Sequence, residues 1–222
     1  MKLAAEGAYT LKSKEYIREG LVDAETENEV KSSVKELELG RHHTHCLSDS
    51  ELRNISNGLV NLESLTIKTL SYVTEEGYDE LFANIKQIRA IVIGENQFTT
   101  ATFASLAKHC RNLQDVTIHD HYSLRSEAIE PFVTFATPLV SLKINNCHYL
   151  SAAIEALVSK CKTLQTLQYT GDLFSSAMKA LCDSNVRNLI TYKVCLRDDV
   201  DSFVLPEGCK LQITYLDEAD SD

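Results

Sequence analysis

LQDVTI at residues 113–118 and LVSLKI at residues 139–144 are the same six-residue block written twice. Each block carries apolar residues at positions 1, 4 and 6, and the last pair alternates as in a short strand with one buried face. A polar loop follows, and then a stretch with apolar residues at helical spacing, namely Ile154, Leu157, Val158 and Cys161 in the second copy. The pair therefore predicts a repeated strand–loop–helix unit.

The block recurs along most of the chain at intervals of 25 to 28 residues. Extra residues in a longer unit shift its first helical apolar residue by the same number, which places the insertions between strand and helix. Thr74, Thr99, Ser151 and Ser175 stand where the helices should start. The seven blocks are VKELEL, LESLTI, IRAIVI, LQDVTI, LVSLKI, LQTLQY and LITYKV, starting at residues 34, 62, 88, 113, 139, 164 and 189.

A strand–helix repeat of this period is the signature of a leucine-rich repeat solenoid. The predicted fold class is therefore α/β, with about seven repeats of 25–28 residues. In this architecture a parallel sheet forms the concave face and the helices form the convex face. Residues at positions 3, 5, 7 and 8 of each unit then point outward from the sheet.

The two ends of the chain do not share the repeat. Residues 1–33 are interpreted as an N-terminal helical cap or arm, because residues 13–22 (SKEYIREGLV) have amphipathic spacing. Residues 34–216 form the predicted repeat domain, closed by a C-terminal cap strand within GCKLQITYL. Residues 217–222 are predicted to be a disordered acidic tail.

The charge balance is acidic but unevenly placed. The chain has 22 Lys and Arg against 32 Asp and Glu, a net charge of −10. The first 33 residues contribute −2 and the tail −4, which leaves −4 for the middle of the chain. Direct nucleic-acid binding is disfavoured, because that affinity comes from clustered Lys and Arg.

Seven cysteines are spread through the chain without a CxxC pair, and the first residues MKLAAEGAY lack an apolar signal segment. Both observations favour a reducing compartment, cytoplasmic or nuclear. The apolar-leaning run at 131–142 is too short to cross a bilayer, so no membrane contact is predicted.

Cysteine placement within the repeat gives a family resemblance. In AKHCRNLQDVTI and VSKCKTLQTLQY a Cys that ends the helix comes three positions before the first Leu of the next strand, and NNC ends at Cys147. This pattern resembles the cysteine-containing class of leucine-rich repeats found in F-box/LRR proteins, over residues 34–205. The resemblance implies substrate recognition in a ubiquitin ligase, with the F-box-binding adaptor and cullin components as partners. No F-box-like helical segment is recognised in the N-terminal region.

Two histidine clusters lie where strand-to-helix loops are expected. GRHHTHCL at residues 40–47 contains the three-residue insertion of the first unit, and insertions in repeats often map to a binding face. Its imidazoles and thiol are suitable ligands for zinc or copper, but donors so close in sequence wrap one tetrahedral ion poorly, and a polar docking loop is the favoured interpretation. His119, Asp120 and His121 form the second cluster, and the two clusters are expected to line one weakly pH-sensitive edge.

No catalytic constellation is recognised, so a non-enzymatic protein-interaction adaptor without cofactor or metal is the leading hypothesis. It would use the concave face and its rim of loops to hold a protein partner. A stand-alone scaffold subunit of a multiprotein assembly is the main alternative, and a metal-dependent sensor or enzyme built on the His-rich loop is the second. The candidate partner-binding residues are Glu36, Glu38, Arg41, His42, His43, His45, Thr66, Lys68, Asp115, Thr117, His119, His121, Lys143, Asn145, Gln168 and Lys193.

Overall fold

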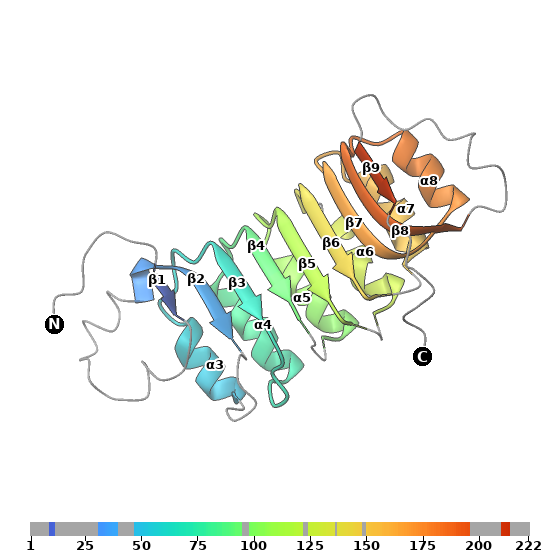
Figure 1. The fold of residues 1–222 in the computed structure, drawn as a ribbon. Helices are drawn as coiled ribbons and strands as arrows, with labels where there is room; N and C mark the ends of the chain where they lie inside the picture. Colours follow the sequence, from blue (N-terminus) through green and yellow to red (C-terminus); the bar gives the residue numbers. More distant parts are fainter. Residues whose placement is uncertain are drawn as a thin grey trace.

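Strands and helices alternate along the computed structural model, and the strands form one parallel sheet (Figure 1). The structure describes residues 9–11, 31–39, 47–94, 98–121, 124–135, 137–147, 150–195 and 210–213. The elements are β1 Tyr9–Leu11, β2 Val34–Leu39, α3 Asp49–Ser56, β3 Ser64–Ile67, α4 Glu75–Asn84, β4 Ala90–Ile93, α5 Thr100–His109, β5 Asp115–His119, α6 Ser126–Thr134, β6 Ser141–Asn145, α7 Ser151–Lys160, β7 Thr166–Phe174, α8 Ser175–Cys182, β8 Asn188–Cys195 and β9 Lys210–Ile213.

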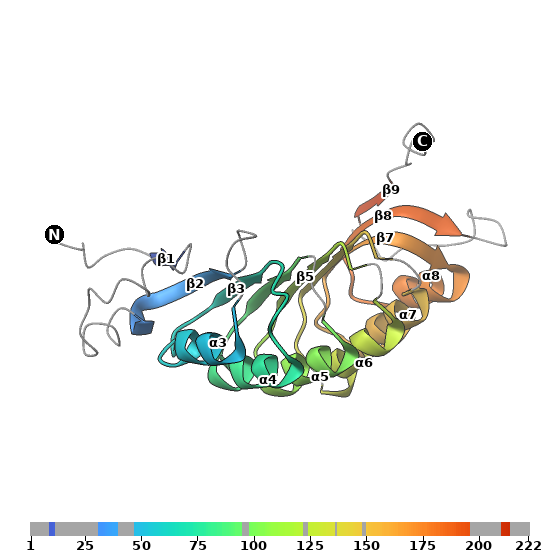
Figure 2. The same cartoon turned by 90° about the horizontal axis from the view of Figure 1, so that it is seen from below.

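The sheet has the strand order β1 to β9, the same as the chain order, and every neighbouring pair is parallel. Figure 2 shows the helices gathered on one side of the sheet, on the outer side of a curved row. The curvature has a simple cause, since a helix is about 10 Å wide whereas neighbouring strands are only about 4.8 Å apart. The predicted α/β repeat architecture, with helices outside and sheet inside, is confirmed.

Pairing confirms the predicted register of the first six units. Residues at position 3 lie opposite one another in successive strands, from Glu36 through Ser64, Ala90, Asp115 and Ser141 to Thr166. The extra residues of the first unit fall between β2 and α3, as predicted. Among the described residues, no helix is long and apolar enough to cross a membrane.

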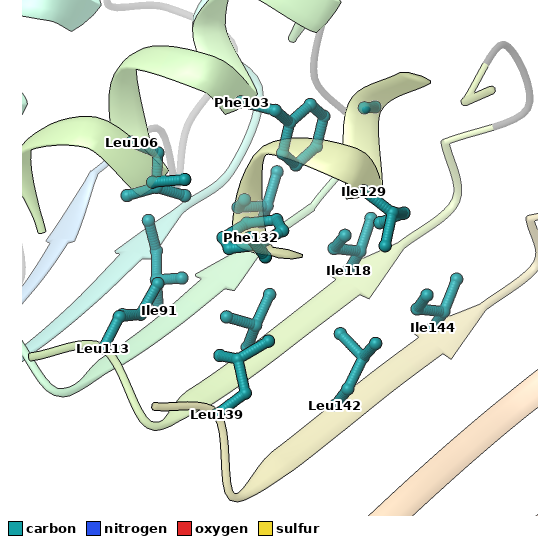
Figure 3. Packing of buried hydrophobic residues seen from close by; sticks show 14 of the residues in the cluster. Ile91, Phe103, Leu106, Leu113, Ile118, Ile129, Phe132, Leu139, Leu142 and Ile144 are labelled. Carbon is teal, nitrogen blue, oxygen red and sulfur yellow. The ribbon is translucent and has the colours of Figure 1, made fainter. Parts of the chain in front are cut away.

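The core lies between the sheet and the helices. Leu142 and Ile144 of β6, at positions 4 and 6, face Ile129 and Phe132 of α6, and all four side chains are fully or almost fully buried (Figure 3). Full burial of such a side chain contributes about 1.5–3 kcal/mol. The buried residues of successive units form one cluster, so the core is a continuous layer along the sheet.

Helix ends follow the predicted signals only in part. Thr74 and Thr99 are N-caps whose hydroxyls accept hydrogen bonds from Gly77 N and Thr102 N, which satisfies orphan backbone donors. Ser151 and Ser175 are instead the first helical residues of α7 and α8, and their helices have no side-chain cap. Ser151 Oγ accepts a hydrogen bond from Phe174 N at 3.0 Å, which ties α7 to the end of β7.

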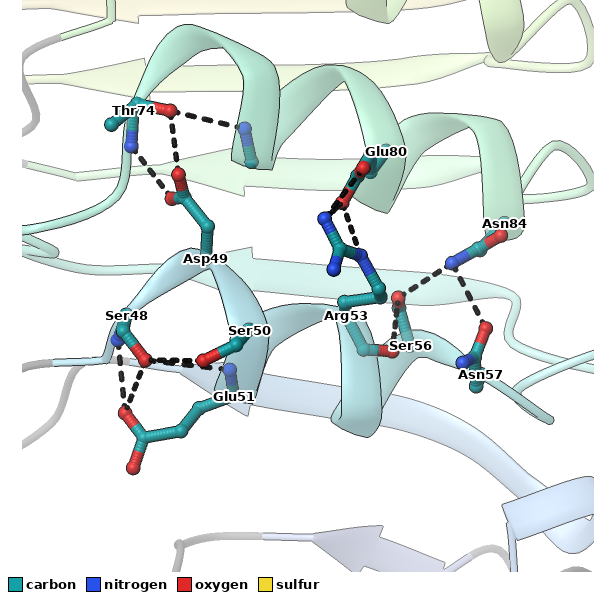
Figure 4. A network of polar contacts seen from close by, with 11 residues as sticks. Ser48, Asp49, Ser50, Glu51, Arg53, Ser56, Asn57, Thr74, Glu80 and Asn84 are labelled. Atoms are coloured by element: carbon teal, nitrogen blue, oxygen red, sulfur yellow. Dashed lines mark hydrogen bonds and ion pairs between the residues drawn. The ribbon is translucent and has the colours of Figure 1, made fainter.

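Polar contacts connect neighbouring helices on the outer side (Figure 4). The Asp49 carboxylate accepts hydrogen bonds from Thr74 N at 2.8 Å and Thr74 Oγ1 at 2.6 Å. Arg53 donates two hydrogen bonds to Glu80, from Nε at 2.6 Å and from Nη2 at 2.7 Å. These contacts join α3 to α4 through polar groups alone.

The register of the seventh unit differs from the prediction. Thr166 pairs with Asn188 and Leu167 with Leu189, so the buried Val186, and not Leu189, occupies position 1. β7 runs directly into α8 without a loop, and α8 has eight residues where α7 has ten. The missing loop and the shorter helix both shorten the sixth unit, so the seventh block, predicted at residue 189, was placed three residues too late.

The described residues of the N-terminal segment are partly as expected. Tyr9–Leu11 forms strand β1, which pairs with β2 and extends the sheet, whereas residues 31–33 are helical. The helical cap or arm predicted for residues 1–33 therefore differs from the structure at residues 9–11 alone among those described. The amphipathic segment 13–22 and the acidic tail 217–222 lie outside the described residues. At the other end β9 pairs with β8, so the predicted terminal strand is confirmed.

Candidate protein-binding surface

The inner face of the sheet carries side chains from positions 3 and 5 of each unit. At its centre these side chains are small and partly exposed. They are Thr66, Val92 and Thr117, which stand side by side on β3, β4 and β5. Ser64 and Ala90 continue the same surface. The helices all lie on the other side of the sheet (Figure 2). Small side chains let another chain approach such a face closely.

Charged pairs occupy the N-terminal end of this face. Lys68 Nζ lies 2.8 Å from Glu38 Oε1, and Lys35 Nζ lies 2.9 Å from Glu63 Oε1. The hydrogen bond from Lys35 lowers the pKa of Glu63, and the positive charge of Lys35 acts in the same direction. Glu36 is exposed beside them. Exposed pairs of this kind add little stability, so they remain available to a partner.

A chain of hydrogen bonds crosses the C-terminal half of the face. Asn145 Nδ2 donates to His119 Nδ1 at 3.1 Å, and Gln168 Nε2 donates to Asn145 Oδ1 at 2.9 Å. The three residues come from β5, β6 and β7, and the structure thus brings together three of the predicted site residues. Asp115 and Lys143 are exposed on the same strands.

Two residues with a left-handed backbone conformation shape the loops of the adjoining rim. Asp120 and Asn146 have φ values of 55° and 53°, a conformation that Asp and Asn adopt more readily than other side chains. Asn146 Nδ2 donates to Asp120 Oδ1 at 2.6 Å, and Asn146 N donates to Thr170 Oγ1 at 2.7 Å. The rim over three units is therefore hydrogen-bonded from one loop to the next. The fixed loops provide a preformed edge to the sheet face.

His121 does not belong to this surface. Its side chain is 4% exposed, its Nε2 lies 2.9 Å from Phe98 O, and its ring packs near Phe103. The equivalent position in two other units holds Leu70 and Cys147, both buried. The structure therefore places His121 in the core and not on the predicted surface, because in these three units the ninth position faces the core.

Lys193 was predicted as the position-5 counterpart of Lys143 and Gln168, and this is also wrong. The position-5 residue of the last unit is Ile190, which pairs with Gln168, whereas Lys193 pairs with Asp172 after an irregularity in the register. Arg41, His42, His43 and His45 of the predicted rim lie outside the described residues. Among those described, no group of three or more His, Cys, Asp or Glu side chains is placed to hold a metal ion.

Two exposed aromatic residues at the same edge were not predicted. Tyr72, in the loop after β3, is 65% exposed, and Phe174, at the end of β7, is 51% exposed. Four strand spacings separate their units, about 19 Å at ~4.8 Å per strand. Aromatic side chains are frequent anchors at interfaces. For Tyr72 the signal available from the sequence was that it does not fit the apolar positions of its unit.

The buried cysteines are packing residues. Burial raises the pKa of Cys110 to about 12 and that of Cys147 to about 11. Cys110 Sγ lies 3.9 Å from Phe82 O and Ile85 O, so the thiol is enclosed by the preceding unit. Because the thiolate is the nucleophile, such raised pKa values oppose a catalytic role for either thiol.

Comparisons with known proteins add little. No family model matches the chain, and a search of curated proteins found no match. A solved structure described as "Crystal structure of Rad7 and Elc1 complex in yeast" contains a similar chain, at 14% identity and a TM-score of 0.33. The match covers 81% of this chain and 74% of that chain. This similarity is too remote to indicate a family or a function.

Proposed function

We propose that the protein is a non-enzymatic leucine-rich repeat module that holds a protein partner on the inner face of its sheet and the adjoining rim. The observation that carries this proposal is the row formed by Thr66, Val92 and Thr117, which is partly exposed and bears no large side chain. The backbone hydrogen bonds beneath it are already made within the sheet. A partner would therefore bind there through contacts with side chains.

The surroundings of this row favour a protein partner. The face offers charged groups at one end, amides and an imidazole at the other, and hydroxyls between them. Tyr72 and Phe174 add apolar anchors at the rim. A mixed polar surface with a few aromatic anchors is typical of non-obligate protein interfaces. The role in a ubiquitin ligase implied by the sequence resemblance stays a prediction.

The test is to block the face without unfolding the protein. The double variant Thr66→Arg/Thr117→Arg places two long side chains on the row, and Ala101→Arg/Ala152→Arg places the same two charges on exposed positions of α5 and α7. Affinity capture from cells with each variant, read by quantitative mass spectrometry, compares the two faces. A partner captured by the wild type and by the helix-face control, but lost from the sheet-face variant, would support the proposal. Equal capture by all three proteins would overturn it. Scoring the F-box-binding adaptor and cullin subunits in the same samples tests the ligase role separately.

A further inference from the structure

The turns that lead from each helix into the next strand form a second surface, at the edge where the strands begin. Backbone hydrogen bonds stack these turns in order: Arg89 N donates to Glu63 O at 2.8 Å and Gln114 N to Arg89 O at 2.8 Å. Further along, Arg187 N donates to Gln165 O at 2.8 Å. Successive turns therefore lie about 4.8 Å apart where they join the sheet. A residue type that recurs in them forms a row.

Cations recur in these turns although the chain as a whole is acidic. The five turns at residues 85–89, 110–114, 135–140, 161–165 and 183–187 hold five Lys or Arg residues and a single carboxylate, Asp183. Lys160 ends α7 beside the fourth turn. All six cationic residues are exposed. This basic edge consists of Lys86, Arg89, Arg111, Lys160, Lys162 and Arg187.

The charges of the basic edge are largely unpaired. Arg89 interacts with Glu63 at the N-terminal end of the row. For the other five residues, no carboxylate oxygen lies within 4.0 Å of the cationic nitrogens in the part of the chain that the structure describes. Elsewhere among the described residues, Lys35, Arg53 and Lys68 each have an acidic partner at that distance, whereas Lys108, Lys143 and Lys179 have none. What distinguishes the edge is therefore that its unpaired cations stand in one row.

Two of the arginines are held in place by neutral groups. Arg111 Nε donates to Lys108 O at 2.6 Å, its Nη1 donates to Phe135 O at 2.9 Å, and its guanidinium lies 4.6 Å from the centre of the Phe135 ring. Arg187 Nη1 lies 3.2 Å from Val186 O. Backbone carbonyls and a ring fix these side chains without cancelling their charge. A fixed guanidinium loses less side-chain freedom when a carboxylate binds to it.

The helix dipole accounts for only part of this pattern. Cations near the last turn of a helix are favourable, which suffices for Lys160. Arg89 and Arg187 lie next to the strand starts, more than a full helical turn beyond the ends of α4 and α8, and the dipole effect falls off within the last turn. The helix dipole therefore does not account for the positions of these two arginines.

We propose that the basic edge binds an acidic polypeptide segment of a partner protein. From the turn before β4 to the turn before β8 the row crosses four strand spacings, about 19 Å, the length of roughly six extended residues. Nucleic acid fits less well, since Glu63 and Asp115 stand beside the row and the whole chain carries −10. The cations of this edge lie outside the sheet face, although Glu63 and Asp115 border both surfaces, and the proposal does not depend on the function proposed above.

The direct test measures binding of a labelled acidic peptide of about ten residues, alternating Glu and Ser, by fluorescence anisotropy at low ionic strength. The triple variant Lys86→Gln/Arg111→Gln/Lys162→Gln should weaken binding at least about tenfold. A matched control, Lys68→Gln/Lys143→Gln/Lys179→Gln, removes three exposed positive charges elsewhere and should change affinity less than about threefold. Added salt should weaken wild-type binding. Equal losses in both triple variants would show diffuse attraction and overturn the proposal.

Further measurements separate this proposal from the alternative explanations. Neither the Lys86 nor the Lys162 side chain makes a described hydrogen bond, so Lys86→Gln/Lys162→Gln tests the edge even if the loss of Arg111 disturbs folding. Tighter binding of a single-stranded oligonucleotide of equal charge would overturn the proposal in favour of nucleic acid. Concentration-dependent self-association in analytical ultracentrifugation, abolished by the edge variant, would identify a second copy of the chain as the occupant and also overturn it.

Discussion

At the scale of single residues, Gly171 shows how tightly the C-terminal part of the sheet is packed. A methyl group there would overlap Tyr169 Oη and would lie 2.8 Å from Cys147 O, a backbone atom that cannot rotate away. Tyr169 is fully buried, and its hydroxyl accepts a hydrogen bond from Leu150 N at 3.0 Å. One added carbon would therefore disturb both β7 and the start of α7.

Gly171→Ala is expected to lower the free energy of unfolding by about 1–3 kcal/mol, the usual cost of overpacking. Gly94→Ala is the matched control, because its methyl would meet its nearest neighbour, Ile67 O, at an ordinary 3.5 Å. Urea unfolding monitored by circular dichroism measures both variants. Similar stabilities of the two variants would show that the packing at Gly171 is less tight than described.

Thiol reactivity offers a second check at this scale. Cys110 and Cys147, whose pKa values burial raises to about 12 and about 11, should react slowly with iodoacetamide in the native protein. Cys161, which is partly exposed, should react faster. Site-resolved mass spectrometry gives the three rates, and in denaturant the differences should vanish. Fast labelling of Cys110 in the native protein would contradict the burial of its side chain.

His121 shows which residue-level features the sequence could not yield. Leu70 and Cys147 occupy the same position of their units and are apolar, but Asn96 and Asp172 occupy it too, so the inward direction of that position was not readable from the repeat. The exposure of Phe174 was not readable, since it depends on β7 passing directly into α8. Local spacing determines which way a side chain points only while the unit keeps its normal length.

At the scale of elements, polar contacts between successive helices supplement the apolar core. The Asp79 carboxylate on α4 accepts a hydrogen bond from Ser105 Oγ at 2.5 Å and lies 3.2 Å from His109 Nε2, both on α5. The hydrogen bond from Ser105 lowers the pKa of Asp79, and His109 adds to the effect. Ionised Asp79 therefore stabilises the folded state at neutral pH.

The sign of the pH effect follows from this lowered pKa. The contribution of Asp79 is present above the ordinary carboxyl pKa of 3.8 and is lost as the pH falls through the lower folded value. Asp79→Asn should therefore cost less than about 1 kcal/mol at pH 7, since the carboxylate is half exposed, and the cost should disappear in acid. Urea titrations of both proteins from pH 7 downward measure the difference. A gap that persists at about pH 2 would exclude the charge as its cause.

The register of the elements was predictable as long as apolar residues occupied the buried positions. Position 6 of the last unit is Thr191, which is fully buried, and LITYKV offered a better apolar match three residues later. The loss of the loop before α8 removed the length cue that the other units provide. A buried hydroxyl and a missing loop together concealed the shift.

At the scale of the whole molecule, composition concealed the distribution of charge. The middle of the chain sums to only −4, which suggested a balanced surface, yet the helix-to-strand turns collect cations on one edge. Repeats produce this separation because one position of the unit always lies at the same edge. Charge therefore has to be summed by position within the unit, and not along the chain.

Units at the two ends of the sheet should be less stable than those at its centre, because each unit is stabilised chiefly by its two neighbours. Amide hydrogens of β4, β5 and β6 are expected to exchange with solvent more slowly than those of β2 and β8. Native-state exchange followed by mass spectrometry of peptides resolves these strands. Uniform protection along the sheet would instead indicate that the described strands unfold as one cooperative body.

The identity of strand order and chain order has a consequence for how the protein is made. None of the described strands has to be inserted between two that were synthesised earlier, so each strand from β2 to β9 can pair with the preceding strand as it leaves the ribosome. The growing chain thus always has a template already in place for its next segment. A folding intermediate of such a chain is simply a shorter version of the finished molecule.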